Sequence, residues 1–246
     1  MLLVVTVFIV IFCSVQAEIP SYIKVCKRND PNLSKCMLDS IELLRPKLKS
    51  GIPELDVPPL EPLPLNEIKL RTGPDQAQIN CNLTNLLVYG PSTFKTLDLK
   101  PDMKKTRFLA QFTIPILYFE GEYDIDMNIL LLKYKGQGPI QGNLTDYVVN
   151  CVLKADKIQK ENQTYLKFRK FNLTLFTGKS YLYLRNLFPE YGTVLADGTN
   201  SFIHENTDLF MNEIKPALED SLADKFTDIA NSIMEKFPFD ALFPDG

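Results

Sequence analysis

The chain has 246 residues, with 27 Lys and Arg against 30 Asp and Glu, and its formal net charge is −3. This slightly acidic balance argues against a nucleic-acid partner, which would select a basic surface. The sequence also lacks a polybasic run that would bind anionic lipid.

Residues 1–17 are predicted to be a signal peptide. An apolar run from Leu2 to Phe12 precedes the small-residue cleavage site Val15-Gln16-Ala17. The run is too short to span a membrane, and no later segment is both uncharged and continuously apolar over a membrane-spanning length. We therefore expect a secreted, extracellular, monomeric protein with no membrane span and a single domain over residues 18–246.

Four cysteines follow the signal peptide, and they allow three pairings. Cys26 and Cys36 are close in sequence, and we pair them first, because their disulfide would join the start of the chain to the first helix. Cys81 and Cys151 both fall on predicted inward faces. They could form a second disulfide if their strands are neighbours, but we favour two buried thiols.

Five Asn-x-Ser/Thr sequences are more than the one or two expected by chance, and they predict a glycoprotein. The candidate glycosylation sites are Asn32, Asn82, Asn143, Asn162 and Asn172. Each must face solvent if it carries a glycan.

The first predicted helix spans residues 33–48, with Ser34 as its cap and an apolar side that ends before Gly51-Ile52-Pro53. Four prolines between Leu55 and Leu65 cannot donate to a strand ladder. This segment is therefore expected to be an extended connection along an edge or the surface.

About seven strands are predicted next, from alternating apolar and polar residues. They lie at residues 79–89, 94–99, 107–119, 123–131, 140–155, 165–176 and 181–188. Gly121 and the segment Gly136-Gln137-Gly138-Pro139 are expected to break the chain, so that 107–119 and 123–131 form a hairpin. No crossover helix separates the strands, which predicts an antiparallel sheet.

Residues 199–237 are predicted to form one long amphipathic helix that ends at Pro238, because apolar positions recur every three or four residues. At about 1.5 Å per residue this helix would exceed roughly 50 Å, longer than a compact domain of this size is wide. A long, strongly curved sheet could cover such a helix. A helix lying in a curved sheet leaves a tube between them.

The chain resembles the insect takeout and haemolymph juvenile hormone binding proteins over essentially its whole mature length. Its opening carries the resemblance through Cys26 to Cys36, Leu44, Pro46, Gly51-Ile52-Pro53-Glu54-Leu55 and Pro59-Leu60-Glu61-Pro62-Leu63. Its close carries it through Asn186-Leu187-Phe188, Asn206, Ile214-Lys215-Pro216, Phe237-Pro238-Phe239-Asp240 and Leu242-Phe243-Pro244. The paired first two cysteines place it nearer the takeout branch.

This resemblance implies an α+β super-roll, in which a highly curved antiparallel β-sheet wraps a long C-terminal helix and encloses a hydrophobic tunnel. It implies a carrier of a small hydrophobic ligand, such as a juvenile-hormone-like terpenoid, a fatty acid or a related lipid. Members of the family act in haemolymph transport, chemosensory organs, and circadian or feeding behaviour. The family motifs do not assign individual ligand contacts.

The inner face of the tube supplies the candidate ligand-binding residues. They are Phe108, Phe112, Ile114, Ile116, Tyr123, Ile125, Met127, Ile129 and Leu131 on strands, with Phe202, Leu209 and Phe210 on the helix. The same side chains could fill a solid core, and the family resemblance favours a cavity. Asn85, Tyr118 and Tyr147 on inner faces could supply a polar anchor.

We predict no catalytic residue, no metal site and no cofactor. His204 is the single histidine, and no nucleophile motif accompanies it. Asp124 and Asp126 lie on an outer strand face, where solvated carboxylates are expected. The alternative to a carrier is a secreted signalling or interaction protein that acts through its outer surface and has a purely structural core.

Overall fold

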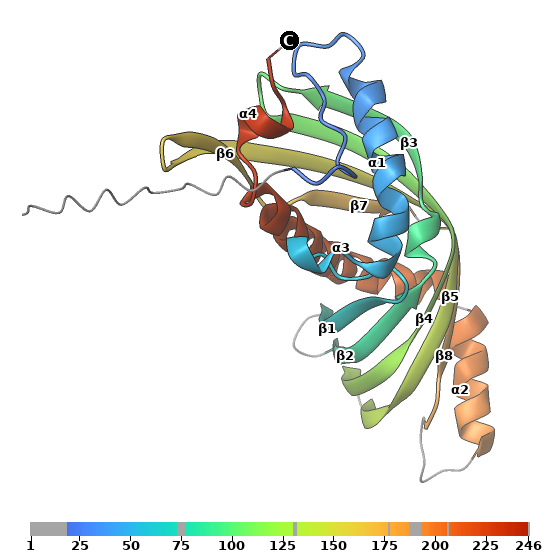
Figure 1. The fold of residues 1–246 in the computed structure, drawn as a ribbon. Coiled ribbons are helices and arrows are strands. Elements are labelled where there is room, and N and C mark those ends of the chain that lie inside the picture. Colours follow the sequence, from blue (N-terminus) through green and yellow to red (C-terminus); the bar gives the residue numbers. More distant parts are fainter. Residues whose placement is uncertain are drawn as a thin grey trace, which may run out of the picture.

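The computed structural model describes residues 19–72, 77–129, 132–176, 178–186, 193–205 and 207–245 (Figure 1). The predicted signal peptide, residues 1–17, lies outside the described residues. The fold is α+β: a large, curved antiparallel sheet, which does not close on itself, holds a long C-terminal helix. The fold class predicted from the sequence is confirmed.

Eight strands form the sheet in the described part of the chain. They are β1 (Leu63–Thr72), β2 (Ala77–Tyr89), β3 (Lys95–Asp102), β4 (Arg107–Ile129), β5 (Leu132–Lys160), β6 (Gln163–Phe168), β7 (Asn172–Phe176) and β8 (Lys179–Leu184). β4 and β5 are the central pair. β2 and β3 pair with successive parts of β4, while β8, β7 and β6 pair with successive parts of β5, and all pairs are antiparallel. β1 pairs with β2 and forms one edge.

The predicted breaks at Gly121 and at 136–139 are wrong, because β4 and β5 run through them as two very long strands. A Cβ atom on Gly121 would lie 2.8 Å from Cδ2 of Leu86 and 2.9 Å from the carbonyl oxygen of Thr84. A Cβ atom on Gly138 would collide with the carbonyl oxygen of Arg185. These glycines permit close packing inside strands and do not mark turns. Strand β1 was not predicted from the sequence.

Four α-helices, α1 (Leu33–Ser50), α2 (Thr193–Glu205), α3 (Thr207–Met234) and α4 (Phe239–Leu242), complete the described fold with two short 3₁₀ helices, η1 (Pro53–Leu55) and η2 (Pro91–Thr93). The predicted cap of the first helix is wrong, because Asn32 is at the N-cap of α1 and the Ser34 hydroxyl donates to the Leu99 carbonyl. The prediction of a single helix over 199–237 is also wrong, because α2 and α3 occupy this part of the chain. Helix α2 begins before residue 199, and residue 206, between the two helices, is outside the described residues. α3 continues through Pro216 and is about 42 Å long at 1.5 Å per residue. α2 packs against β8, and α3 crosses the concave side of the sheet (Figure 1).

Helix α3 bridges the two edges of the open sheet, packing against β1 on one side and against β6, β7 and β8 on the other. Its polar side chains complete the unpaired backbone of the second edge. Asn231 accepts a bond from the Phe168 N–H at 2.7 Å and donates to the Phe168 carbonyl at 3.0 Å. Glu219 accepts from the Leu175 N–H at 2.7 Å. Strand groups that would otherwise be left without partners at a covered edge are thus satisfied.

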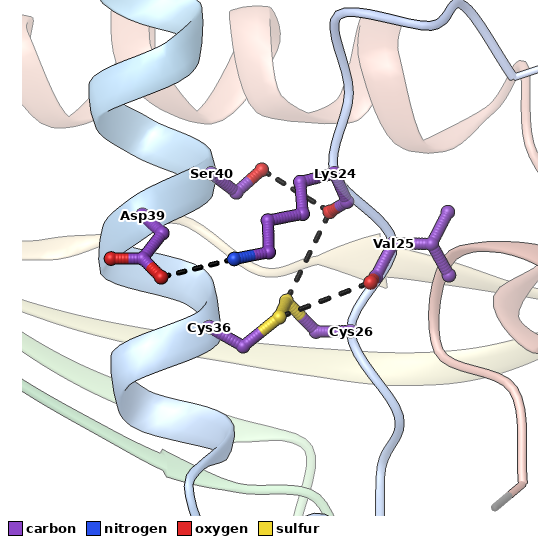
Figure 2. Close-up of polar contacts among 6 residues, drawn as sticks. All are labelled: Lys24, Val25, Cys26, Cys36, Asp39 and Ser40. Carbon is purple, nitrogen blue, oxygen red and sulfur yellow. Dashed lines mark hydrogen bonds and ion pairs between the residues drawn. A yellow bond between two sulfur atoms is a disulfide. The ribbon is translucent and has the colours of Figure 1, made fainter.

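The predicted disulfide between Cys26 and Cys36 is confirmed, and it fastens the N-terminal segment to α1 (Figure 2). Beside it, Lys24 forms an ion pair with Asp39 at 3.0 Å, and Ser40 donates to the Lys24 carbonyl at 3.2 Å. The start of the chain is therefore held along one side of the first helix by covalent and polar contacts.

Cys81 and Cys151 are free thiols, as favoured from the sequence. Cys81 pairs with Ile125 of β4, whereas Cys151 pairs with Ala110, fifteen positions away on that strand. At about 3.3 Å per residue this separation is roughly 50 Å, which excludes a disulfide between them. Burial raises the pKa of each thiol to about 11, so both stay protonated.

The carboxylate of Glu61 fixes the turn before β3. It accepts bonds from the Gly90 N–H at 2.9 Å, the Ser92 N–H at 3.0 Å and the Ser92 hydroxyl at 2.7 Å. Burial alone would raise the pKa of Glu61, but these hydrogen bonds outweigh burial and leave that pKa below its usual value.

We predict that replacing Asn231 with Ala lowers the free energy of unfolding by about 1–3 kcal/mol, because both backbone groups of Phe168 lose their partner. Asp228→Ala, an exposed position on the same helix, should change that free energy by less than about 0.5 kcal/mol. Urea denaturation of the two variants measures the difference. Equal midpoints would show that α3 does not stabilise this edge through Asn231.

We also predict that Glu61→Gln lowers the free energy of unfolding by about 1–2 kcal/mol at neutral pH. Because the folded pKa of Glu61 is depressed, its contribution is present above the usual carboxyl pKa and is lost as the pH falls through the folded pKa. Denaturation curves of wild type and variant should therefore converge in acid. The exposed Glu235→Gln serves as control; a Glu61→Gln difference that does not depend on pH would refute this assignment.

Candidate ligand-binding cavity

A cavity of about 760 Å³ lies between the concave face of the sheet and helices α2 and α3. Its walls come from β1, β2, β4, β5, β7, β8 and both helices. The lining residues are Leu63, Leu65, Ile68, Leu70, Cys81, Leu83, Leu86, Val88, Pro91, Ile114, Leu117, Phe119, Ile125, Ile140, Leu144, Tyr147, Val149, Leu173, Leu175, Leu182, Leu184, Ile203, Met211, Asn212, Ile214, Leu218, Leu222 and Phe226.

The walls are almost wholly aliphatic. Cys81, Tyr147 and Asn212 contribute polar side-chain atoms to the lining, and none of the lining residues that the structure describes carries a charge. The volume lies within the range of roughly 300–1,000 Å³ that is typical of small-molecule sites. Such a space is suited to an aliphatic or terpenoid molecule, because its binding transfers apolar surface out of water.

The cavity is confined to one part of the interior because aromatic side chains fill the other. Phe108 packs against Phe168 at a centroid distance of 6.0 Å and against Phe243 at 6.5 Å, and Phe168 packs against Phe171 at 5.4 Å. This aromatic cluster packs the C-terminal end of α3, together with α4, against the sheet. Aliphatic side chains on the remaining strands do not reach far enough to fill the space beneath α3.

The candidate residues from the sequence divide between these two regions. Ile114 and Ile125 line the cavity. Tyr123 is 2% exposed in the same apolar cluster, and its hydroxyl donates to the Arg185 carbonyl at 2.8 Å. Phe108 and Phe112 belong to the filled aromatic region instead.

Ile116 does not lie on the inner face as predicted, since its side chain is 62% exposed. The inward positions on β4 include Ile114 but continue at Leu117 and Phe119, so the alternation shifts by one residue near Pro115. Opposite this point on β5, Asp146 has a φ of +57°. At these paired positions, the inward-facing side chains of both strands shift by one residue. A strict alternation of inward and outward residues does not predict this shift.

The remaining candidates cannot be placed. The side chains of Met127, Ile129, Phe202, Leu209 and Phe210, and the whole of Leu131, lie outside the described residues. They stay predictions.

Most of the cavity wall, including Leu65, Ile68 and Leu70 on β1, was not predicted, because the proline-rich approach to β1 was interpreted as a connection. The cavity residues on α3 could be predicted from the sequence. They belong to its apolar stripe and are Ile214, Leu218, Leu222 and Phe226. Spacing showed that these side chains share one face, but it could not show which of them face empty space.

Tyr147 is the best-placed polar group at the cavity. It is 3% exposed, and its hydroxyl lies 2.5 Å from the hydroxyl of Ser180 on β8. Burial raises the pKa of Tyr147 and outweighs the hydrogen bond to Ser180, which lowers that pKa, so the phenol is uncharged at physiological pH. The other two proposed anchors face outward: Asn85 donates to Glu122 at 3.1 Å and Tyr118 to Glu120 at 3.2 Å.

His204 is exposed and packs edge-on against Tyr181, with 4.9 Å between ring centroids. Within the described residues, no group of three or more His, Cys, Asp and Glu side chains could hold a metal ion. None of the helices in this part of the chain has the length and apolar character needed to cross a membrane.

An open antiparallel sheet around a helix, with an aliphatic cavity between them, is the architecture of a hydrophobic-ligand-binding protein. The haemolymph juvenile hormone binding protein (JHBP) family matches residues 2–244, and the chain belongs to this family, whose members bind small hydrophobic ligands. The resemblance found in the sequence is thereby confirmed.

Individual relatives match this chain over nearly its full length. The circadian clock-controlled protein daywake of Drosophila melanogaster is 25% identical over 245 residues, covering 94% of this chain and 91% of daywake. A Schistocerca gregaria protein named "Putative beta-carotene-binding protein" is 22% identical over 225 residues, covering 90% of this chain and 88% of the relative. The crystal structure of Epiphyas postvittana Takeout 1 has the same fold, with a TM-score of 0.74 at 21% identity over 90% of this chain and 100% of that one.

We predict that Ile114→Trp weakens binding of a fluorescent fatty acid by about tenfold or more, because the indole would occupy part of the cavity. Ile116→Trp, two residues away on the opposite face of the same strand, should leave the affinity within about twofold. Fluorescence titration of both variants measures this contrast. Similar losses in both would place the probe outside the cavity.

Proposed function

We propose that this protein is a secreted carrier that binds a small hydrophobic ligand in its internal cavity. The observation that supports the proposal is the 760 Å³ space with aliphatic walls beneath α3. The ligand class is a juvenile-hormone-like terpenoid, a fatty acid or a related lipid. Each methylene group moved from water into such walls contributes about 0.8 kcal/mol, so affinity comes mainly from the length of the apolar chain.

The hydroxyl pair of Tyr147 and Ser180 gives the ligand a point of orientation. An uncharged phenol can donate to a ligand carbonyl, ester or alcohol oxygen, or accept from a ligand hydroxyl. Because the lining residues are uncharged, the apolar part of the ligand lies deep, and an ionised group on it would remain near water.

Secretion is supported by the signal-peptide sequence and by the Cys26–Cys36 disulfide, since such bonds form and persist in oxidising compartments. Four of the five predicted glycosylation sites, Asn32, Asn143, Asn162 and Asn172, have exposed side chains. We propose a monomer that acts by binding and not by catalysis.

The relatives' names point the same way. The Schistocerca gregaria relative is named for binding beta-carotene, a long apolar molecule, and the matched family is named for binding juvenile hormone. The alternative, an interaction protein with a purely structural core, accounts less well for an interior that side chains leave unfilled. The Drosophila melanogaster relative is named for circadian control, which motivates an assay of daily expression but does not identify a ligand.

The decisive experiment is native mass spectrometry of the chain secreted from insect cells, with lipid extraction of the same sample. We expect a defined adduct, identified as a terpenoid or acyl lipid, that dissociates on denaturation. Delipidated protein should then bind acyl probes with an affinity that rises about fourfold per methylene until the cavity is filled. Protein that is purified empty and takes up neither fatty acids nor juvenile hormone would refute the carrier proposal.

A further inference from the structure

Three neighbouring strands place Asn143 between two tyrosines on the outer face of the sheet. Tyr118 of β4 pairs with Asn143 of β5, and Asn143 pairs with Tyr181 of β8. Paired residues on adjacent strands project to the same face, and adjacent strands lie about 4.8 Å apart. The asparagine side chain therefore stands between two aromatic side chains whose backbones are about 10 Å apart.

Further apolar groups extend this row. Tyr89 of β2 pairs with Tyr118, and their ring centroids are 5.7 Å apart. Ile116, which is 62% exposed, pairs with Thr145, the residue two positions after Asn143. Tyr181 is 41% exposed and rests against His204 of α2. We call the set Tyr89, Ile116, Tyr118 and Tyr181 the outer patch.

Asn143 points into this patch and away from the cavity. Its neighbour Leu144 lines the cavity, and successive side chains on a strand face opposite sides. The Asn143 side chain is exposed. The sequence Asn143-Leu144-Thr145 is an acceptor for N-glycosylation, and exposed apolar patches usually mark a surface that another group covers.

We propose that Asn143 carries an N-linked glycan whose first sugar packs between Tyr118 and Tyr181 and covers the outer patch. A pyranose ring presents C–H groups on its faces, and these are attracted to the negative faces of aromatic rings. The attachment point lies midway between the two tyrosines, so the first sugar reaches them without extending the chain. This inference rests on the secretion in the proposed function.

Two other strand sequons, at Asn82 and Asn172, lack this arrangement. The Asn82 amide already donates to Glu67 at 2.9 Å, and its oxygen is buried. Asn172 is exposed on β7, but its strand partner is the aliphatic Val152. Asn172 is therefore the matched control, because it is an exposed strand sequon without flanking aromatic rings.

The test uses the full chain secreted from eukaryotic cells that keep glycans in the high-mannose form. Glycopeptide mass spectrometry reports occupancy at each asparagine. Endoglycosidase H then leaves a single sugar on each occupied site, and hydroxyl-radical footprinting compares the oxidation of Tyr118 and Tyr181 in trimmed wild type and in Asn143→Gln.

We expect Asn143 to be occupied, and both tyrosines to be protected in the trimmed protein but oxidised severalfold faster in Asn143→Gln. The melting temperature of Asn143→Gln should fall by about 2–4 °C relative to trimmed wild type, and that of Asn172→Gln by less than about 1 °C. In a Tyr181→Ala background the Asn143→Gln change should have a smaller effect, because the two residues would act through one contact.

Two results would overturn the inference: Asn143 bare while other sequons are occupied, or equal tyrosine oxidation with and without the first sugar. Either leaves the carrier proposal standing, since lipid binding is measured separately on the same secreted protein. Conversely, an occupied, protective glycan on a protein that binds no lipid would support this inference and refute the carrier.

Discussion

The open edges of the sheet are the constraint on which this structure depends. A strongly curved sheet that does not close has unpaired backbone groups along β1 and along β6, β7 and β8, and such edges need a cover. Helix α3 lies between them and supplies it. On the β6–β8 side the contacts are specific. Glu219 and Asn231 accept hydrogen bonds from strand N–H groups, and Thr227 accepts one from the N–H of Phe171, between β6 and β7.

The same helix divides the interior into a solid part and a hollow part. Toward its C-terminal end, phenylalanines from β4, β6 and α4 meet and fill the space. Toward its N-terminal end, the facing strands carry mostly leucine and isoleucine, which leave the cavity unfilled. The position of the cavity thus follows from where large and small apolar residues fall along two very long strands.

Much of the architecture could be predicted from the sequence, because periodicity reports which side chains share a face. The antiparallel sheet, the first helix and the Cys26–Cys36 disulfide were all predicted correctly. The site was harder. Ile116 was assigned to the wrong face because the strands turn over near Pro115 and Asp146, and Phe108 was assigned to the cavity because apolar character alone does not separate filled space from empty space.

Most residues of the family motifs hold the fold together, although Leu63 and Ile214 also line the cavity. Ile52 and Leu55 of the Gly51–Leu55 motif are buried beside the aromatic cluster, and Glu61 holds the turn at Gly90 and Ser92. Phe239 and Phe243 of the closing motif fill the solid end. Contacts of this kind fix the geometry of the sheet and of the helix around the cavity.

A hollow interior requires that the helix above it be held by something other than the missing contacts. On α3, the side chains of Leu218 and Phe226 face the cavity. The next residue after each, Glu219 and Thr227, accepts a hydrogen bond from the backbone of β7 or of the β6–β7 connection. Neighbouring residues on α3 therefore have different roles: one lines the cavity, and the next bonds to the edge of the sheet. Hydrogen bonds from α3 to the edge of the sheet, and the aromatic cluster at one end, keep α3 in place, so the cavity can stay open without the helix collapsing into it.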